Sequence, residues 1–221
     1  KNITKKNTIF NLLEVLEKKK LLNNKKFKII VKKQIPNKAG LGGGSMNAAT
    51  ILKYFIKKKF IKINKKKVIE ISNLVSSDVI LGLKSTNSIL TSSNKIKYFR
   101  KCEKFYTLIV KPNFGCSTKD IYSKVKKYNK PRLNKPLKKM FNLDYLKKMN
   151  NSLEPIALSK YSQLRKIKLH LENLSRPEFV RMTGSGSAFV AYFRSKKRCD
   201  IAKKMFNKKY KNYWCIVSKT I

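Results

Sequence analysis

Glycine positions are the clearest chemical signal in this 221-residue chain, which contains only eight glycines. Six of the eight fall in two short stretches, GLGGGS from residue 40 and TGSGS from residue 183. Glycine is favoured where φ must be positive or where the backbone closely approaches a ligand. Successive backbone N–H groups in front of a helix form a binding site for anions. The two stretches therefore predict an anion site, and we favour the polyphosphate of a nucleotide as the anion.

The elements around the first stretch support this interpretation. Residues 27–33 (FKIIVKK) are short, apolar and β-rich, which predicts a strand, and residues 46–58 have apolar side chains at helical spacing. The order strand, glycine loop, helix directs backbone donors at an anion. The loop has neither the Gly-Lys-Ser/Thr of a Walker loop nor the dinucleotide-binding pattern. A flexible turn is the alternative, but the composition of the chain otherwise disfavours glycine.

A phosphoryl acceptor needs a base or an oriented carboxylate, and acids are scarce, with 11 in the whole chain. Asp78 stands out because it follows a predicted helix over residues 65–75 and precedes the apolar residues 79–81. We expect this carboxylate to be at least partly buried. A helix cap or a turn is the commoner role of an isolated Asp, and the residues around Asp78 alone favour that role.

Charge is a weaker guide than the glycines. Lys and Arg total 54 against 11 acids, a net charge of +43, which suggests a nucleic-acid-binding protein. However, only seven of the basic residues are Arg, and the lysines are spread along the chain instead of forming one basic tail. Abundant Lys, Asn, Ile, Phe and Tyr are also typical of proteins from AT-rich genomes.

Cysteine, histidine and hydropathy exclude several classes of site. The four cysteines include no C-x-x-C pair and the only histidine is His170, so we expect no zinc site and no Ser-His-Asp or Cys-His catalysis. Reduced thiols of a cytoplasmic protein are the simpler interpretation. No apolar run approaches the roughly 20 residues that span a bilayer.

The motif Pro36-x-x-x-Gly40-Leu41-Gly42-Gly43-Gly44-Ser45 resembles the ATP-binding signature of the GHMP kinases, which include galactokinase, homoserine kinase and mevalonate kinase. Met46 replaces the usual Ser or Ala. Ser77-Asp78-Val79 resembles the segment that carries the catalytic aspartate, with Ile80 in place of the usual Pro. Residues 181–188 (RMTGSGSA) resemble the third family signature, a second glycine loop beside the phosphates.

Two further segments resemble one branch of this family. Pro112, Ser117-Thr118 and Tyr122 are similar to a loop before a helix whose aromatic residue stacks on cytidine, and residues 151–154 (NSLE) are similar to an Asn-Asp-Leu-Glu segment. The acceptor of that branch is a cytidine-diphosphate-linked methylerythritol, in the non-mevalonate route to isoprenoid (terpenoid) precursors.

The resemblance implies an ATP-dependent phosphotransferase that acts on an alcohol group, with ATP and Mg²⁺ as cofactors and no protein metal ligands. It implies a small-molecule substrate, a cytoplasmic location, a monomer or weak dimer, and neither specific nucleic acid nor membrane as partner. Another GHMP kinase, of the mevalonate or homoserine type, and a basic nucleic-acid-binding protein are the alternatives. The implied site comprises Asp78 as catalytic residue, Tyr122 for the substrate, and for ATP Pro36, Gly40, Leu41, Gly42, Gly43, Gly44, Ser45, Thr183, Gly184, Ser185 and Gly186.

Mixed helices and strands with antiparallel pairs predict an α+β fold. The resemblance implies a ribosomal-S5-like ATP-binding domain over residues 1–103 and a ferredoxin-like domain over residues 104–221. The family's first signature, an N-terminal strand with a lysine that partners the catalytic aspartate, has no match here, so we expect an incomplete chain with little activity alone. The remaining elements predicted in the second part are strands at 106–110, 179–182, 188–193 and 214–218, and helices at 118–127, 143–148, 163–174 and 199–208.

Overall fold

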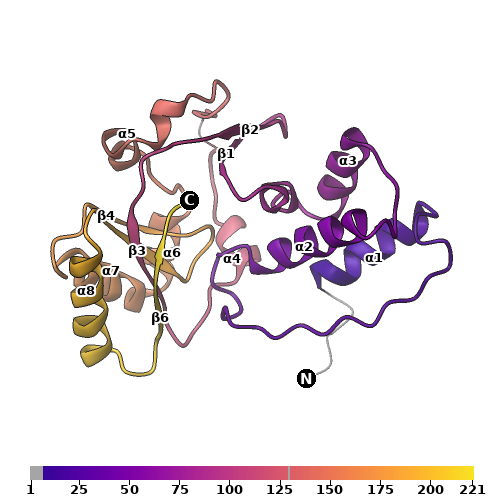
Figure 1. The fold of residues 1–221 in the computed structure, drawn as a ribbon. Helices are drawn as coiled ribbons and strands as arrows, with labels where there is room; N and C mark the ends of the chain where they lie inside the picture. The colour runs from indigo at the N-terminus through magenta and orange to yellow at the C-terminus, as the bar shows by residue number, and fades with distance from the viewer. Residues whose placement is uncertain (1–6, 129) are drawn as a thin grey trace. The chain divides into compact units, whose positions relative to one another are not determined.

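The chain folds into two compact units, each with its own core (Figure 1). The computed structural model describes residues 7–128 and 130–221. The first unit contains residues up to 33, 42–99 and 133–136, and the second contains residues 34–41, 100–132 and 137–221. Helices combine with antiparallel sheets in the structure, which confirms the α+β fold class. The division into domains 1–103 and 104–221 stays a prediction.

Three helices and a short 3₁₀ helix build the first unit. Asn7 caps the first helix, since its side chain accepts hydrogen bonds from the N–H groups of Ile9 and Phe10 at 2.9 and 3.0 Å. The apolar faces of these helices meet in one core that includes the fully buried Leu12 and Leu52. The elements are α1 (Thr8–Lys18), α2 (Gly43–Lys57), α3 (Lys65–Val75) and η1 (Val79–Leu83).

The first unit also contains a hairpin that the sequence analysis did not predict. Strands β1 (Asn87–Leu90) and β2 (Ile96–Phe99) pair antiparallel, with Asn87 opposite Phe99. The turn between them places Asn94 at φ 58°, a conformation that Asn tolerates better than most residues. Each strand has only four residues, too few for a clear alternation of apolar and polar side chains.

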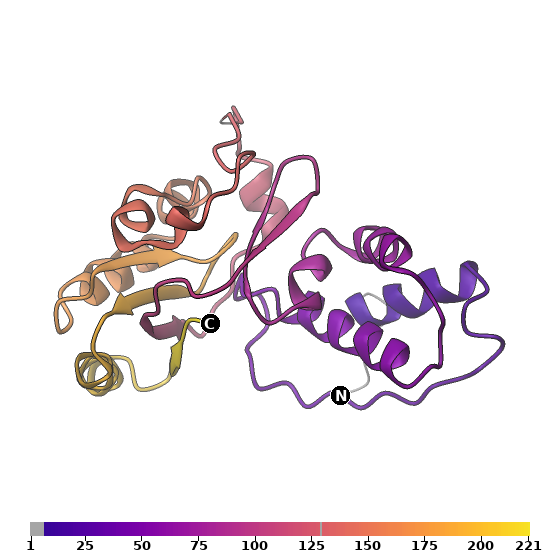
Figure 2. The same ribbon diagram turned by 45° about the horizontal axis from the view of Figure 1, so that its top comes forward.

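The strand predicted over residues 27–33 is absent, so this prediction was wrong. The ring centroid of Phe27 lies 4.4 Å from that of Phe55 and 5.4 Å from that of Phe60. The residues that follow Phe27 form an extended segment without regular secondary structure (Figure 2). Among the described residues, none pairs with residues 27–32 through backbone hydrogen bonds, and Ile30 is 77% exposed. Residues with high β-propensity form a strand only where a neighbouring strand can pair with them, so propensity alone does not establish one.

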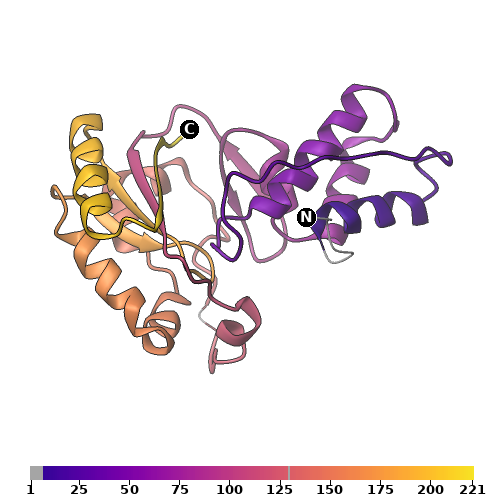
Figure 3. The ribbon, with the colours of Figure 1, turned by 90° about the horizontal axis from the view of Figure 1, so that it is seen from below.

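A four-stranded antiparallel sheet forms the centre of the second unit, in the order β4-β5-β3-β6. Helices α7 and α8 pack on one face of this sheet (Figure 3), and their buried side chains share one core with Leu108 and Phe189. The sequence β-α-β-β-α-β with this strand order is the ferredoxin-like arrangement that we predicted. The strands are β3 (Tyr106–Lys111), β4 (Phe179–Met182), β5 (Phe189–Phe193) and β6 (Trp214–Lys219), and the helices are α7 (Ser162–Glu172) and α8 (Lys196–Lys209).

Shorter elements connect these strands and helices. The helix predicted over residues 118–127 ends at Tyr122, because the following stretch is lysine-rich and offers little apolar surface to bury. Asn151 begins the turn that leads into the helix starting at Glu154. These elements are α4 (Thr118–Tyr122), η2 (Lys138–Phe141), α5 (Leu143–Lys148) and α6 (Glu154–Lys160).

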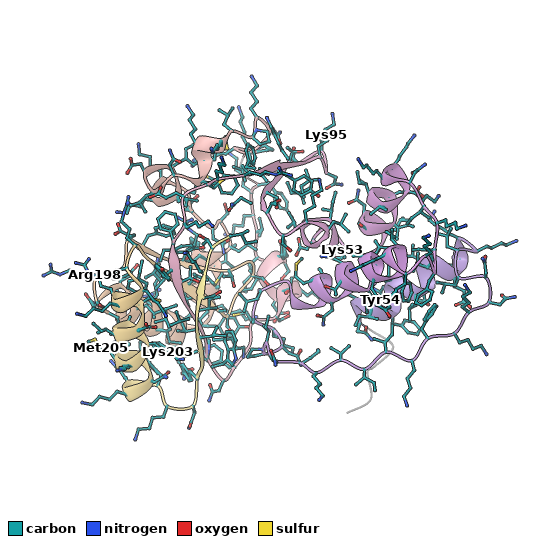
Figure 4. All side chains as sticks on the ribbon, in the orientation of Figure 1. Lys53, Tyr54, Lys95, Arg198, Lys203 and Met205 are labelled. Atoms are coloured by element: carbon teal, nitrogen blue, oxygen red, sulfur yellow. The ribbon has the colours of Figure 1, made fainter. Side chains whose placement is uncertain are left out.

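Basic side chains are spread over both units (Figure 4), for example Lys53 and Lys95 in the first unit and Arg198 in the second. The basic residues are therefore not confined to one unit. Within residues 7–128 and 130–221, no helix has the length and apolar character needed to cross a membrane.

Candidate functional site

The N-terminus of α2 presents backbone donors to an open space. Gly42 precedes the helix at φ 64°, and no side chain caps the helix there. The first helical hydrogen bond runs from the N–H of Met46 to the carbonyl of Gly42 at 3.0 Å, which leaves the N–H groups of residues 43–45 without helical acceptors. A Cβ atom built on Gly42 or Gly43 meets nothing within 4 Å. This end of α2 can therefore admit an anion close to its backbone.

Ser45, in the first turn of α2, connects this end of the helix to the segment of Asp78. The Oγ atoms of Ser45 and Ser76 are 3.3 Å apart, and the side chain of Ser45 is buried. Ser76 ends α3, two residues before Asp78. In the first unit, the contact between these two hydroxyls therefore links the start of α2 to the turn that carries Asp78.

The side chain of Asp78 is exposed, so the prediction of a partly buried carboxylate was wrong. The neighbouring Val79 and Ile80 are fully buried and point into the core, which turns Asp78 outward. Asp78 precedes η1 but makes no capping hydrogen bond with its side chain. Gly82 lets η1 lie against α2, because a Cβ there would be 2.7 Å from the Cβ of Ala49. The turn is therefore held by packing, and the carboxylate is left unbound among the described residues.

The first half of the first glycine motif, including Pro36 and Leu41, belongs to the second unit, where it binds the second glycine loop. The N–H of Ala188 donates to the carbonyl of Ala39 at 3.1 Å, and the hydroxyl of Thr183 donates to the same carbonyl at 3.1 Å. Gly40 lies at φ 70°, and a Cβ on it would be 2.3 Å from the carbonyl oxygen of Thr183. Two motifs far apart in the sequence thus form one continuous backbone structure.

The second glycine loop, residues 183–187, is a tight turn with one exposed tip. The N–H of Gly186 donates to the carbonyl of Thr183 at 2.8 Å, and both Gly184 (φ 47°) and Gly186 (φ 83°) have positive φ. The Oγ of Ser185 lies 2.8 Å from Oγ1 of Thr118, so this hydroxyl already has a partner. Within the described part of the chain, the N–H groups of Gly184 and Ser185 have no hydrogen-bond acceptor. These two amides are the free donors of the loop.

Tyr122 lies at the last turn of α4 and is 49% exposed. Its ring stacks on no described aromatic residue. Ser117 caps α4, and an ion pair between Asp120 and Lys160 at 2.8 Å fixes the helix to α6. An exposed ring on a fixed helix can stack on a planar ligand.

Buried basic and thiol groups support the segment between β3 and α4. The Nζ atom of Lys111 donates to the carbonyl of Phe114 at 2.8 Å, and burial lowers the pKa of this lysine. Burial raises the pKa of the Cys116 thiol to about 11, which keeps it protonated at neutral pH. Gly115 makes room for Lys38, since a Cβ there would be 2.5 Å from the Cβ of Lys38. Within the described ranges, no three His, Cys, Asp or Glu side chains form a metal-binding group.

Comparison with known proteins agrees with these features. Residues 7–89 match the family model of the GHMP kinases N terminal domain. The chain is 56% identical over 221 residues to the 4-diphosphocytidyl-2-C-methyl-D-erythritol kinase of Pelagibacter ubique (strain HTCC1062), an alignment that covers 100% of this chain and 79% of the relative. It is 33% identical over 201 residues to the kinase of the same name from Buchnera aphidicola subsp. Schizaphis graminum, covering 87% of this chain and 65% of the relative.

Solved structures share the fold at lower identity. A crystal structure of 4-(cytidine 5'-diphospho)-2C-methyl-D-erythritol kinase superposes with a TM-score of 0.76 at 19% identity and covers 98% of this chain and 80% of that one. A homoserine kinase from Cytophaga hutchinsonii superposes with a TM-score of 0.69 at 15% identity, covering 98% and 76% of the two chains. Together with the two glycine motifs and the sequence identity, these findings show that the chain belongs to the GHMP kinase family of ATP-dependent phosphotransferases.

Proposed function

We propose that this chain transfers the γ-phosphoryl group of ATP to a hydroxyl of 4-diphosphocytidyl-2-C-methyl-D-erythritol, a step in the non-mevalonate route to isoprenoid precursors. The observation that carries the choice of acceptor is the 56% identity over the whole chain to a kinase with this name. The free N–H groups at the start of α2 and the exposed carboxylate of Asp78 in the same unit support phosphoryl transfer.

The chemistry follows from these groups. Free backbone N–H groups that can stabilise the charge on the phosphates of ATP lie in each unit, at residues 43–45 in the first and at Gly184 and Ser185 in the second. In the second unit, Gly40 packs on the loop that carries the second set, and Pro36 and Leu41 belong to the same segment as Gly40. Asp78 accepts the proton of the acceptor hydroxyl while the bond between the γ-phosphorus and the bridging oxygen of ADP breaks.

Mg²⁺ is compatible with this site although the described residues form no metal cluster. The ion typically keeps several waters and binds substrate phosphates together with one or two protein oxygens, so a full set of protein ligands is unnecessary. When bound, the ion would neutralise part of the negative charge of the phosphates. We place the enzyme in the cytoplasm as a monomer or weak dimer.

An acceptor panel tests the proposal. With ATP and Mg²⁺, the cytidyl-linked acceptor is expected to yield ADP, whereas homoserine and mevalonate are not. Turnover of homoserine or mevalonate instead would favour another GHMP activity, consistent with the homoserine kinase fold neighbour. Tight RNA binding with a steep salt dependence and no ADP formation would favour the nucleic-acid alternative.

Replacing Tyr122 with Ala is expected to raise the KM for the cytidyl acceptor about tenfold, because stacking of a base on an aromatic ring contributes about 1–3 kcal/mol. The KM for ATP should stay within about twofold. Tyr128→Ala is the matched control, since Tyr128 is also an exposed tyrosine (76%) and has no assigned role. An unchanged acceptor KM in Tyr122→Ala, or an equal change in both variants, would remove Tyr122 from the site.

A further inference from the structure

Two side chains at the start of α6, Asn151 in the turn before the helix and Glu154 at its first residue, hold the second glycine loop. Nδ2 of Asn151 donates to the carbonyl of Met182 at 2.9 Å and to the carbonyl of Gly184 at 2.7 Å. The N–H of Met182 donates to Oε2 of Glu154 at 2.8 Å. Both backbone groups of Met182, the last residue of β4, and the carbonyl of Gly184 in the loop are thus bound by this one turn.

These contacts take the place of the backbone hydrogen bonds that a second neighbouring strand would make to β4. β4 is an edge strand that pairs with β5 on one side only, so the backbone groups of Met182 that face away from β5 would otherwise be without protein partners. Glu154 is only 7% exposed, and its other oxygen, Oε1, binds Nζ of Lys168 at 2.5 Å. Buried hydrogen bonds to a charged group are stronger than neutral ones, and a group left unsatisfied there is costly.

The turn itself is anchored independently of Asn151 and Glu154. The guanidinium of Arg181 donates to the carbonyl of Leu146 at 2.6 Å and also to the carbonyl of Met149. Oδ1 of Asn151 accepts the N–H of Leu153 at 3.0 Å, which closes the turn locally. Asn151 therefore has two separable functions, since Oδ1 shapes the turn and Nδ2 holds the loop.

We propose that Asn151 and Glu154 are positioning residues that fix the second glycine loop so that the N–H groups of Gly184 and Ser185 point at the nucleotide phosphates. The role in phosphate binding rests on the function proposed above, whereas the role in ordering the loop does not. The carbonyl of Gly184 is bound by Asn151, and its peptide partner is the N–H of Ser185, so the contact sets the direction of that donor. The similarity of residues 151–154 to a family segment gave no role to either side chain.

Asn151→Asp separates the two functions of Asn151. Asp keeps the oxygen that accepts from Leu153 but replaces two donated hydrogen bonds by a negative charge beside two carbonyl oxygens. We expect the KM for ATP to rise about tenfold or more, while the KM for the acceptor stays within about twofold. Amide hydrogen exchange at Thr183, Gly186 and Ser187, the loop residues whose N–H groups are hydrogen-bonded, should become about tenfold faster.

Asn173→Asp is the matched control. Asn173 also donates from Nδ2 to a carbonyl, that of Leu169 at 2.9 Å, but at the exposed end of α7. It should leave the KM for ATP and the exchange of residues 183–187 unchanged. Wild-type values of both in Asn151→Asp would overturn the proposal, and so would equal changes in the two variants.

Two substitutions test the role of Glu154, one that keeps a hydrogen-bond acceptor and one that removes it. Glu154→Gln keeps an acceptor for the N–H of Met182 and should retain slow exchange of that amide, whereas Glu154→Ala should accelerate it. Lys168→Met removes the ion pair with Glu154, together with the longer one to Glu172 at 3.7 Å, and leaves the contact with Met182 in place; it is expected to behave as Glu154→Gln does. Equally fast exchange in Glu154→Gln and Glu154→Ala would show that the charge, and not the contact with Met182, is what matters, and would overturn the role of Glu154. If the wild-type chain does not use ATP, the proposed function fails, and the exchange comparisons still decide whether Asn151 and Glu154 order the loop.

Discussion

Gly40→Ala is expected to destabilise the second unit and to abolish its measurable nucleotide binding. The new Cβ would lie 2.3 Å from a backbone oxygen of Thr183, and alanine at φ 70° is strained. The left-handed conformation costs about 1–2 kcal/mol for a non-glycine residue, and overpacking adds about 1–3 kcal/mol. Thermal unfolding should show a midpoint lowered by about 10 °C, at about 2–4 °C per kcal/mol for a chain of this size.

Gly43→Ala is the informative counterpart. Its Cβ meets nothing within 4 Å, and residue 43 is the first of α2, where alanine favours the helix. We expect an unchanged or slightly higher melting temperature together with weaker ATP binding, because the methyl group occupies the space in front of the free N–H groups. A Gly40→Ala protein that melts like wild type would contradict the docking of the two glycine motifs. Unchanged ATP affinity in Gly43→Ala would remove the start of α2 from the nucleotide site.

Asp78→Asn is expected to lower kcat by about 10²–10⁴-fold, the contribution typical of a general base. The substitution keeps the shape of the side chain and removes only its ability to take a proton. Because the side chain of Asp78 is exposed and makes no capping hydrogen bond, the melting temperature should stay within about 2 °C of wild type. Steady-state kinetics at saturating ATP and acceptor, with a thermal melt of each protein, measure both quantities.

Asp144→Asn provides the control for the loss of one exposed carboxylate. Asp144 lies in the first turn of α5, is exposed, and belongs to neither glycine motif nor the Asp78 turn. Its variant should keep a kcat within about twofold of wild type. If Asp78→Asn retains activity within threefold, Asp78 is not the base, and its exposed position then reflects an ordinary turn.

The elements that sequence predicted well are those whose signals are local. α3 begins where predicted because Asn64 accepts a hydrogen bond from the N–H of Lys67 at 2.9 Å, and its apolar side chains recur at helical spacing. The sequence drew attention to both glycine motifs, but it gave no sign that residues 39–40 bind residues 183–188. That contact joins positions more than 140 residues apart, and no periodicity reports it.

The predictions that failed depended on tertiary partners. Apolar neighbours suggested burial for Asp78, but in the structure Val79 and Ile80 are buried while the side chain of Asp78 is exposed. Gly82 and Gly115 lie outside the two glycine stretches, and in the structure they make room for Ala49 and Lys38. The sequence alone does not separate packing glycines from those that face open space, whereas the structure does.

The extended segment over residues 27–32 affects the tendency of copies of this chain to associate. Since no described residue binds its backbone groups and Ile30 is exposed, we expect a second copy to be able to add a β-strand to this segment and start aggregation. The lysines at positions 28 and 32 and the net charge of +43 oppose that contact by repulsion. Screening shortens the range of this repulsion from about 10 Å at 0.1 M salt to about 3 Å at 1 M. We therefore expect the chain to stay dispersed in low-salt buffer and to aggregate more readily in concentrated salt, where the repulsion between its lysines is screened.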